Sequence, residues 1–342
     1  MTSVKTVRID RDPGDDGLGR GAFEFSDAYS VFDWGEMPDT IPGKGASLCT
    51  MGAANFERLE DEGVPTHYDG VGADARPLES ALAAGDPPTE MAIQIARVPD
   101  LPFEDGRYDY DAFHAAAGDR FVVPLEIVFR RTVPPGSSLR RRTDPDDHGL
   151  DAASWPEGTV ELPEPIVEFS TKYEQQDRYL DREAADQIAG PASIGVLETR
   201  AREVERVVTR QADRAGWTHA DGKIECVYAD GEVLVADVAG TFDENRFLAD
   251  GQQLSKEFLR QHYRRTQPEW VEAITAAKDE AAERDLADWR ALCARDPEPL
   301  PGDLRELASD LYRGGANAYL DRRVFDAPPI ETTIDAIAGL SA

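Results

Sequence analysis

Lysine is scarce in this chain. Only six of its 37 basic residues are lysine, whereas 67 acidic residues give a formal net charge of -30. Lysine carries a compact, mobile ammonium that the planar guanidinium of arginine does not replace. We therefore expect the retained lysines to mark functional segments, and five of them lie in stretches dense in Gly, Ser, Asp and Glu. These five are Lys5, Lys44, Lys172, Lys223 and Lys256, while Lys278 lies outside such a stretch.

A basic face is also lacking, and phosphate backbones require one, so nucleic-acid binding is excluded. The negative charge is spread along the sequence rather than held in one tail, which indicates a property of the whole surface. Adaptation to high salt accounts for this negative charge. At 1 M salt the screening length falls to about 3 Å, which suppresses the repulsion between carboxylates. We therefore expect a halophilic lineage. An acidic surface for a basic partner is the alternative.

The sequence has few cysteines and no long apolar run. Cys49, Cys226 and Cys293 are too few and too scattered for a disulfide framework or a zinc site. No run reaches the length of a membrane span, and the opening MTSVKTVRID has no signal-peptide pattern. We expect a cytoplasmic protein with no membrane partner. A hydrophobic content of 41% over 342 residues predicts a folded chain of one or two domains.

Hairpins dominate the first 130 residues, without the strand–helix alternation of a doubly wound sheet, which predicts an α+β fold. Gly19-Arg20-Gly21 fits a hairpin turn better than a phosphate loop. An Asp230-Gly231 turn is a strong hairpin signal. Predicted strands are Val4–Ile9 with Ala22–Phe25, Met91–Val98 paired with Phe121–Phe129 in a second sheet, and Lys223–Tyr228 with Val233–Val238. Predicted helices are Ala46–Glu62, Ile194–Ala215, Trp270–Ala294 and Leu304–Leu320.

One segment has the composition of a phosphate cradle. Glu126 precedes Arg130 by four residues, and a turn then presents Gly136, Ser137 and Ser138. A Gly-Ser turn offers N–H groups and hydroxyls, and arginine adds a planar fork of donors. Taken alone, such a segment is as often only a turn.

The hairpin that begins Asp221-x-Lys223-x-Glu225 is more specific. Alternation along a strand sends these three side chains to one face, and the partner strand can bring Asp237 alongside. Carboxylates with an ammonium suit a hard cation that carries a nucleotide. An exposed polar hairpin face is the alternative interpretation.

Six segments in the same order resemble the phosphoribosylaminoimidazole-succinocarboxamide synthase (SAICAR synthetase) family, over roughly residues 3–265. They are EFSDAYSVFDWGEMPDTIPGKG, VVPLEIVFRRTVPPGSS, LPEPIVEFSTK, DGKIE, ADVAGTFDENRF and QLSKEFLR. The resemblance implies an ATP-grasp-like α+β fold in two parts. A small antiparallel, ATP-covering domain (1–120) would lie over a larger α+β domain (121–342) that holds the substrate and metal site and the C-terminal helices.

The resemblance also implies the reaction, in which ATP activates an imidazole carboxylate nucleotide for coupling to L-aspartate. A carboxylate is a poor acyl donor, so ATP first makes it an acyl phosphate, which the aspartate amine then displaces. The implied cofactors are ATP and Mg²⁺, the partners are these small molecules, and the chain would be a monomer or homodimer. A related carboxylate–amine ligase and a catalytically silent nucleotide-binding paralogue are the alternatives.

Residue by residue, the resemblance assigns a site. It implies ATP contacts for Lys5, Lys172, Glu225 and Asp237, with Glu225 and Asp237 also as Mg²⁺ ligands. It implies catalytic roles for Lys223, Asp33 and Glu126. Substrate contacts are implied for Ser30, Lys44, Arg130, Ser137, Asp177, Asp243, Arg246, Lys256 and Arg260.

The chain departs from the family pattern at four points. Only Ser3-Val4-Lys5 remains of an opening that usually has a glycine and two basic residues. The spacing from arginine to the Gly-Ser turn is one residue longer, which leaves open whether Arg130 or Arg131 meets the phosphate. Val238 replaces an acidic residue, and Cys226-Val227 replaces Phe-Gly.

Overall fold

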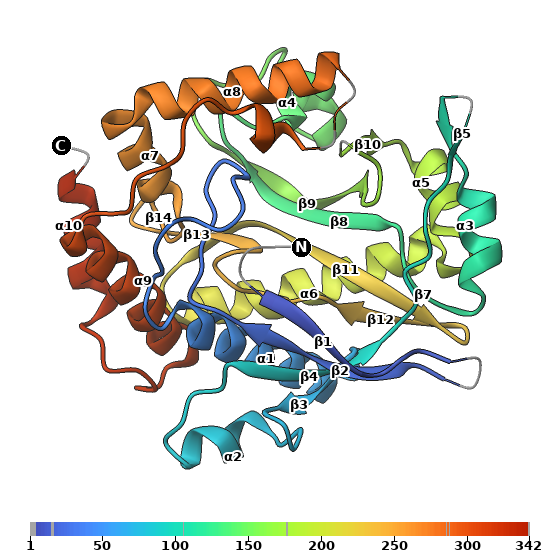
Figure 1. Ribbon diagram of the computed structural model, residues 1–342, viewed down its shortest axis with the longest axis horizontal. Helices are drawn as coiled ribbons and strands as arrows, with labels where there is room; N and C mark the ends of the chain where they lie inside the picture. The colour runs from blue at the N-terminus through green and yellow to red at the C-terminus, as the bar shows by residue number, and fades with distance from the viewer. Residues whose placement is uncertain are drawn as a thin grey trace.

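The computed structural model describes residues 5–14, 17–104, 106–175, 177–284, 286 and 288–340, so the Ser3-Val4 part of the opening motif lies outside the described residues. The described chain forms two main antiparallel sheets with helices around them (Figure 1). The strand pairings within these sheets are antiparallel, which confirms the predicted α+β class and excludes a parallel central sheet.

The first sheet has four strands in the order β1-β2-β4-β3. It confirms the predicted N-terminal hairpin, since β1 (Lys5–Arg11) pairs with β2 (Gly19–Phe25). The strands β4 (Glu90–Ile95) and β3 (Tyr68–Val71) complete it. Helix α1 (Lys44–Asp61) contacts β2, β3 and β4 and buries its apolar residues there, as its periodicity predicted.

The second sheet is organised around one long strand, β11 (Thr218–Ala229). One half of β11 lies between β8 (Leu125–Val133) and β13 (Asn245–Ala249), and the other half lies between β12 (Glu232–Ala236) and β7 (Arg120–Val122). The predicted hairpin around Asp230-Gly231 is therefore confirmed. The sheet continues through β9 (Val160–Thr171) to β10 (Tyr179–Leu180) on one side and to β14 (Gln252–Gln253) on the other.

The predicted pairing of Met91–Val98 with Phe121–Phe129 is wrong. Both edges of β4 are occupied by β2 and β3, and both edges of β8 are occupied by β9 and β11. The two segments meet only at an isolated bridge between Arg97 and Phe121. The first segment contains most of β4, whereas the second is divided between β7 and β8, and these strands lie in different sheets.

Helices cover the sheets and close the ends of the molecule (Figure 1). Helix α6 (Ile194–Arg214) contacts β8, β9, β11 and β12, while α9 (Gly302–Leu320) packs on both α1 and α6. The predicted helix Trp270–Ala294 is wrong in extent, because α8 (Pro268–Glu283) ends earlier and a separate 3-10 turn follows at Trp289–Leu292. The remaining elements are α2 (Leu78–Ala83), β5 (Phe103–Glu104), β6 (Arg107–Tyr108), α3 (Tyr110–Ala117), α4 (Leu139–Arg142), 3-10 turns at Pro145–His148 and Gly190–Ala192, α5 (Arg182–Ala189), α7 (Glu257–Thr266) and α10 (Ile330–Leu340).

A short segment, 65–67, ties the two sheets together. The Val235 N–H of β12 donates to the Pro65 carbonyl at 2.9 Å, and the His67 N–H donates back to the Val235 carbonyl at 3.0 Å. The Gln94 N–H of β4 donates to the His67 carbonyl at 2.7 Å. The first sheet is thus hydrogen-bonded to the strand that leads to Asp237.

No helix in the described ranges is both long enough and apolar enough to span a bilayer.

Candidate active site

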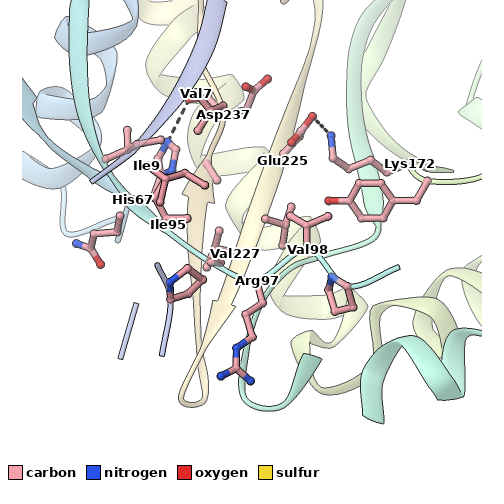
Figure 2. A pocket seen from close by; sticks show the side chains of 18 of the residues that line it. Val7, Ile9, His67, Ile95, Arg97, Val98, Lys172, Glu225, Val227 and Asp237 are labelled. Carbon is pink, nitrogen blue, oxygen red and sulfur yellow. Dashed lines mark hydrogen bonds and ion pairs between the residues drawn. The ribbon is translucent and has the colours of Figure 1, made fainter. Parts of the chain in front are cut away.

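A cleft of about 1050 Å³ lies between the two sheets (Figure 2). Its apolar walls come from β1, β4 and the second sheet, and include Val7, Ile9, Ile95 and Val227. Its polar end is formed by Lys5, Glu126, Lys172, Lys223, Glu225, Asp237 and Glu244. Asp12, Arg97 and Asp100 also line the cleft. A cavity that combines an apolar wall with a cluster of charged groups is suited to a ligand with a flat ring and phosphates.

Each lysine in the cleft is paired with a carboxylate. Lys5 bonds to Asp237 and Lys172 bonds to Glu225, while the Lys223 Nζ to Glu126 Oε1 distance is 2.8 Å. The members of these pairs come from β1, β8 and β11 and from the residues that directly follow β9 and β12. The structure thus brings together six predicted site residues, although Lys5 and Asp237 are 232 positions apart in the sequence.

Glu244 is a fourth cleft carboxylate that sequence reasoning missed. Its Oε2 is buried without a hydrogen-bond partner, and Lys223 Nζ lies 3.5 Å away. Burial is the main reason that its pKa is raised, and the neighbouring charge of Asp237 adds to the shift. Glu244 stands next to Asp243 in a segment that resembles the family, but it was not among the predicted site residues.

Glu225 and Asp237 titrate differently although they are neighbours. Burial, followed by the charge of Asp237, raises the pKa of Glu225 to about 7. Burial alone would also raise the pKa of Asp237, but the Lys5 ammonium outweighs it and lowers that pKa. Asp237 is therefore the more firmly ionised of the two.

The two carboxylates fit an Mg²⁺ ion that a nucleotide carries. Mg²⁺ is commonly held by one or two carboxylates with phosphate oxygens and waters completing the shell. Within the described ranges there is no group of three His, Cys, Asp or Glu residues that could hold a metal by itself. The donor set thus suits an ion delivered with its nucleotide rather than a resident metal.

A second cluster gathers arginines around Asp221. Arg130 is buried and donates to Glu168, to Asp221 at 3.1 Å and to the Tyr179 hydroxyl at 3.0 Å, while Arg246 pairs with the same Asp221. Asp221 thus orients two guanidinium groups that were predicted to bind phosphate.

Arg142 also reaches this cluster, although it was not among the predicted site residues. It contacts Glu168 at 2.6 Å and stacks 3.7 Å from the centre of the Tyr179 ring. Arg131 instead pairs with Glu205 on α6, at 2.8 Å. Of the two adjacent arginines, Arg130 is the one that joins Arg246. Ser137 is buried in the turn before α4, where its Oγ accepts from the Leu139 N–H at 3.3 Å.

A third cluster surrounds Asp243. Its carboxylate accepts from buried Lys44 at 2.8 Å and from the Tyr312 hydroxyl at 2.9 Å, with Lys256 Nζ 3.9 Å away. Burial tends to raise the pKa of Asp243, but Lys256 and Lys44 lower it far more. The two predicted substrate lysines therefore share one permanently charged carboxylate.

The remaining predicted residues lie near the loop 30–35. Asp33 has a left-handed φ of 60° and pairs with Lys278 of α8 at 2.6 Å. Ser30 Oγ accepts from the Gly35 N–H at 3.2 Å. Arg260 of α7 pairs with Glu257 at 3.2 Å and lines a second cavity, of about 370 Å³, together with Asp33 and Lys278. Lys278 is therefore at a candidate site, although the sequence gave no sign of it.

Asp177 is largely exposed after β9. Burial of its carboxyl, followed by the charge of Glu126, raises its pKa, so it is electrostatically coupled to the cleft.

Comparison with known proteins identifies the family of the chain. The model of the SAICAR synthetase family matches residues 15–277. A relative from Archaeoglobus fulgidus, provisionally described as a phosphoribosylaminoimidazole-succinocarboxamide synthase, is 39% identical over 98% of both chains.

Two solved structures show the same fold. A SAICAR synthetase in complex with ADP has a TM-score of 0.53 at 23% identity, covering 87% of this chain and 99% of that one. The Saccharomyces cerevisiae SAICAR synthase complexed with SAICAR has a TM-score of 0.58 at 17% identity, covering 94% of each chain.

The family match and the Archaeoglobus fulgidus relative show that the chain is an ATP-dependent carbon–nitrogen ligase. The chain belongs to the SAICAR synthetase family, whose members act in purine biosynthesis.

Proposed function

We propose that this cleft joins 5-amino-1-(5-phospho-D-ribosyl)imidazole-4-carboxylate to L-aspartate, with ATP split to ADP and phosphate. The observation that carries the proposal is the cleft itself, where three lysine–carboxylate pairs and Glu244 meet at the end of an apolar slot. Relatives that hold ADP or SAICAR support it.

The first sheet covers the nucleotide in this proposal. The adenine lies along the apolar wall from β1 and β4, and the phosphates lie against Lys5 and Lys172. Glu225 and Asp237 would hold Mg²⁺, which when bound neutralises charge on the phosphates. This assignment corresponds to an ATP-covering domain at 1–120 over a larger domain at 121–342.

The imidazole nucleotide lies along the other half of β11. Its phosphate meets Arg130, Arg246, Ser137 and Arg260, and its aminoimidazole lies near Asp33 and Glu126. A phosphate monoester favours guanidinium forks and hydroxyl donors together, and Asp221 already holds two of these guanidinium groups in place. Substrate contacts are also proposed for Ser30, Asp177, Asp243 and Lys256, and for Lys44, which is buried against Asp243.

The chemistry takes two steps. The imidazole carboxylate oxygen attacks the γ-phosphorus of ATP, and the bond from that phosphorus to the β-γ bridging oxygen breaks, leaving an acyl phosphate and ADP. The aspartate amine then attacks the acyl carbon, phosphate leaves, and the amine loses a proton. Lys223 lies among the carboxylates at the polar end of the cleft, where its charge stabilises the transferring oxygens.

The direct test is product formation in molar KCl with ATP, Mg²⁺, the imidazole carboxylate nucleotide and L-aspartate. We expect SAICAR and ADP in equal amounts by mass spectrometry and none when aspartate is left out. Binding of ADP without SAICAR formation, or faster coupling to another amine, would contradict the proposal.

Asp237→Asn tests the metal assignment. Asn tolerates the left-handed backbone at this position and keeps one oxygen, but it removes the charge. We expect turnover to fall at least about 100-fold with the fold retained, because hydrogen-bonded and metal-bound charges are worth several kcal/mol. The measurements are kcat, which reports turnover, and a circular dichroism spectrum, which reports whether the fold is retained. Glu24→Gln, an exposed β2 change, is the control.

A further inference from the structure

Asp237 has a left-handed backbone conformation. It directly follows β12, and its φ is 64°, in the left-handed region that residues other than glycine, asparagine and aspartate seldom occupy. Such a residue persists only where its surroundings fix it. The direction of its carboxylate therefore depends on what holds its main chain.

His67 provides the first of these contacts. Its Nε2 lies 3.1 Å from the Asp237 carbonyl oxygen, and Figure 2 shows the ring turned toward that main chain. A carbonyl oxygen can only accept, so Nε2 carries the hydrogen. The imidazole is 3% exposed and lies against the rings of Phe23 and Phe56, so it has little freedom to turn away.

Asn55 holds the last two residues of the turn that begins at Asp237. Its amide Nδ2 donates to the carbonyls of Ala239 at 3.0 Å and Gly240 at 3.2 Å, and its Oδ1 accepts from the Tyr319 hydroxyl. The side chain is fully buried. A Cβ at Gly240, where φ is 73°, would collide with the Asn55 amide.

These contacts converge on one turn, 237–240, and His67 also lines the cleft. His67 belongs to the segment whose backbone bonds to both sheets, and Asn55 lies on α1. The turn leads on to Asp243 and Glu244, both of which were placed in candidate sites above. Neither His67 nor Asn55 has a role in the reaction proposed for the cleft.

We propose that His67 is a positioning residue, which fixes the Asp237 main chain through Nε2–H so that the carboxylate faces the metal–nucleotide, with Asn55 fixing the rest of the turn. This inference rests on the proposed function only in taking Asp237 as a ligand of the metal–nucleotide. Removal of a group that orients a metal ligand commonly lowers metal affinity about 10- to 100-fold.

The test compares His67→Gln with His67→Met, two side chains of similar length of which only glutamine can donate to the carbonyl. Binding of Mn²⁺·ADP is measured by the electron paramagnetic resonance of free Mn²⁺, and binding of ADP without metal is measured by calorimetry. We expect the Met variant to bind Mn²⁺·ADP about 10- to 100-fold more weakly than the wild type, with the Gln variant within about threefold. ADP without metal should bind with the same affinity to the wild type and to both variants.

The chain offers a matched control in His114. Its Nε2 lies 2.9 Å from the Ile188 carbonyl, and its ring contacts Phe113 and Phe121, so it makes the same kind of bond away from the carboxylates. His114→Met should leave Mn²⁺·ADP affinity unchanged. Equal affinities for the Gln and Met variants of His67, or an equal loss in His114→Met, would overturn the inference.

A measurement on the unaltered protein covers the case in which the variants do not fold. Nitrogen-15 spectra of the histidines should show the Nε2–H tautomer of His67 with and without Mg²⁺·ADP, and the Nδ1–H tautomer would overturn the inference. These binding experiments need no turnover. A wild type that makes no SAICAR, yet whose metal–nucleotide binding depends on the His67 donor, would reject the proposed reaction and uphold the positioning role.

Discussion

Two roles are open to Arg260: binding the phosphate of the imidazole nucleotide, or supporting the cleft. In this structure it pairs with Glu257 on its own helix, where it also borders Asp33 across the smaller cavity. Arg260→Lys keeps the charge and loses the fork. We expect the Michaelis constant for the imidazole nucleotide to rise about tenfold, a cost near that of one charged hydrogen bond, with little change for ATP.

Steady-state kinetics with each substrate varied in turn checks this. Arg265→Lys, on the same helix but bonded to the Leu340 carbonyl, is the control. Equal increases for ATP and the imidazole nucleotide would mean that Arg260 supports the cleft rather than the phosphate.

His219 predicts an acid sensitivity that is independent of catalysis. Burial lowers its pKa below the ordinary value, and Glu205, Asp221 and Arg131 are the charged groups facing it. As the pH falls through about 6.5, the unfolded chain binds a proton that the folded chain resists, so stability is lost. We expect His219→Gln to reduce the drop in melting temperature between pH 7 and pH 5. An identical drop in both proteins would show that other groups govern acid unfolding.

At the scale of elements, α8 and the turn after it hold the Asp33 loop. Phe32 and Trp34 pack edge-on against Trp270, and Arg290 donates to the Trp34 carbonyl at 3.1 Å. Lys278 completes the contact at Asp33. The loop, with left-handed φ at both Phe32 and Asp33, is thus fixed by a helix that extends beyond the family match.

Lys278→Ala should therefore raise the Michaelis constant for the imidazole nucleotide while leaving that for ATP unchanged. The Asp33 side chain is 85% exposed, so the pair is worth at most about 1 kcal/mol and the rise at most about fivefold. Arg284→Ala, which breaks the exposed α8 pair with Glu280, is the matched control. A rise in both variants would point to loosening of the whole helix.

Features of the fold that depend on neighbouring residues could be predicted from the sequence, whereas features that depend on contacts across the molecule could not. The β11–β12 hairpin was predictable because an Asp-Gly turn and alternating side chains lie within a few residues of each other. The end of α8 was not, because Trp289 leaves the helix to pack on Trp34, a contact made across the molecule. The wrong pairing of β4 with β8 has the same cause, since their true partners are set by the assembly of two sheets.

The same distinction holds for the candidate site, where residues could be predicted but the contacts between them could not. Residues in segments similar to the family could be named from the sequence, including the Glu225 and Asp237 pair. Which lysine meets which carboxylate could not, because Lys172 and Glu225 come from different strands. Glu244, Arg142 and Lys278 were missed because nothing in their own segments distinguishes a surface charge from one facing a cavity.

At the scale of the whole molecule, the charge of -30 should make stability depend on salt. Repulsion among exposed carboxylates is screened as the Debye length falls from about 10 Å at 0.1 M to about 3 Å at 1 M. We expect the melting temperature to rise steadily from dilute buffer to molar KCl. Sucrose, which screens nothing, is the control for general solvent effects, and a melting temperature independent of KCl would show that the acidic surface serves another purpose.

The aromatic contacts around Asp33 give the molecule an optical property. Of its five tryptophans, Trp34, Trp270 and Trp289 lie together, with ring centres 5.6 and 5.9 Å from that of Trp34. Indoles this close exchange excitation energy, so part of the ultraviolet emission of the protein reports on this one loop. Entry of a nucleotide beside Asp33 would then be visible as a change in intrinsic fluorescence, without any attached dye.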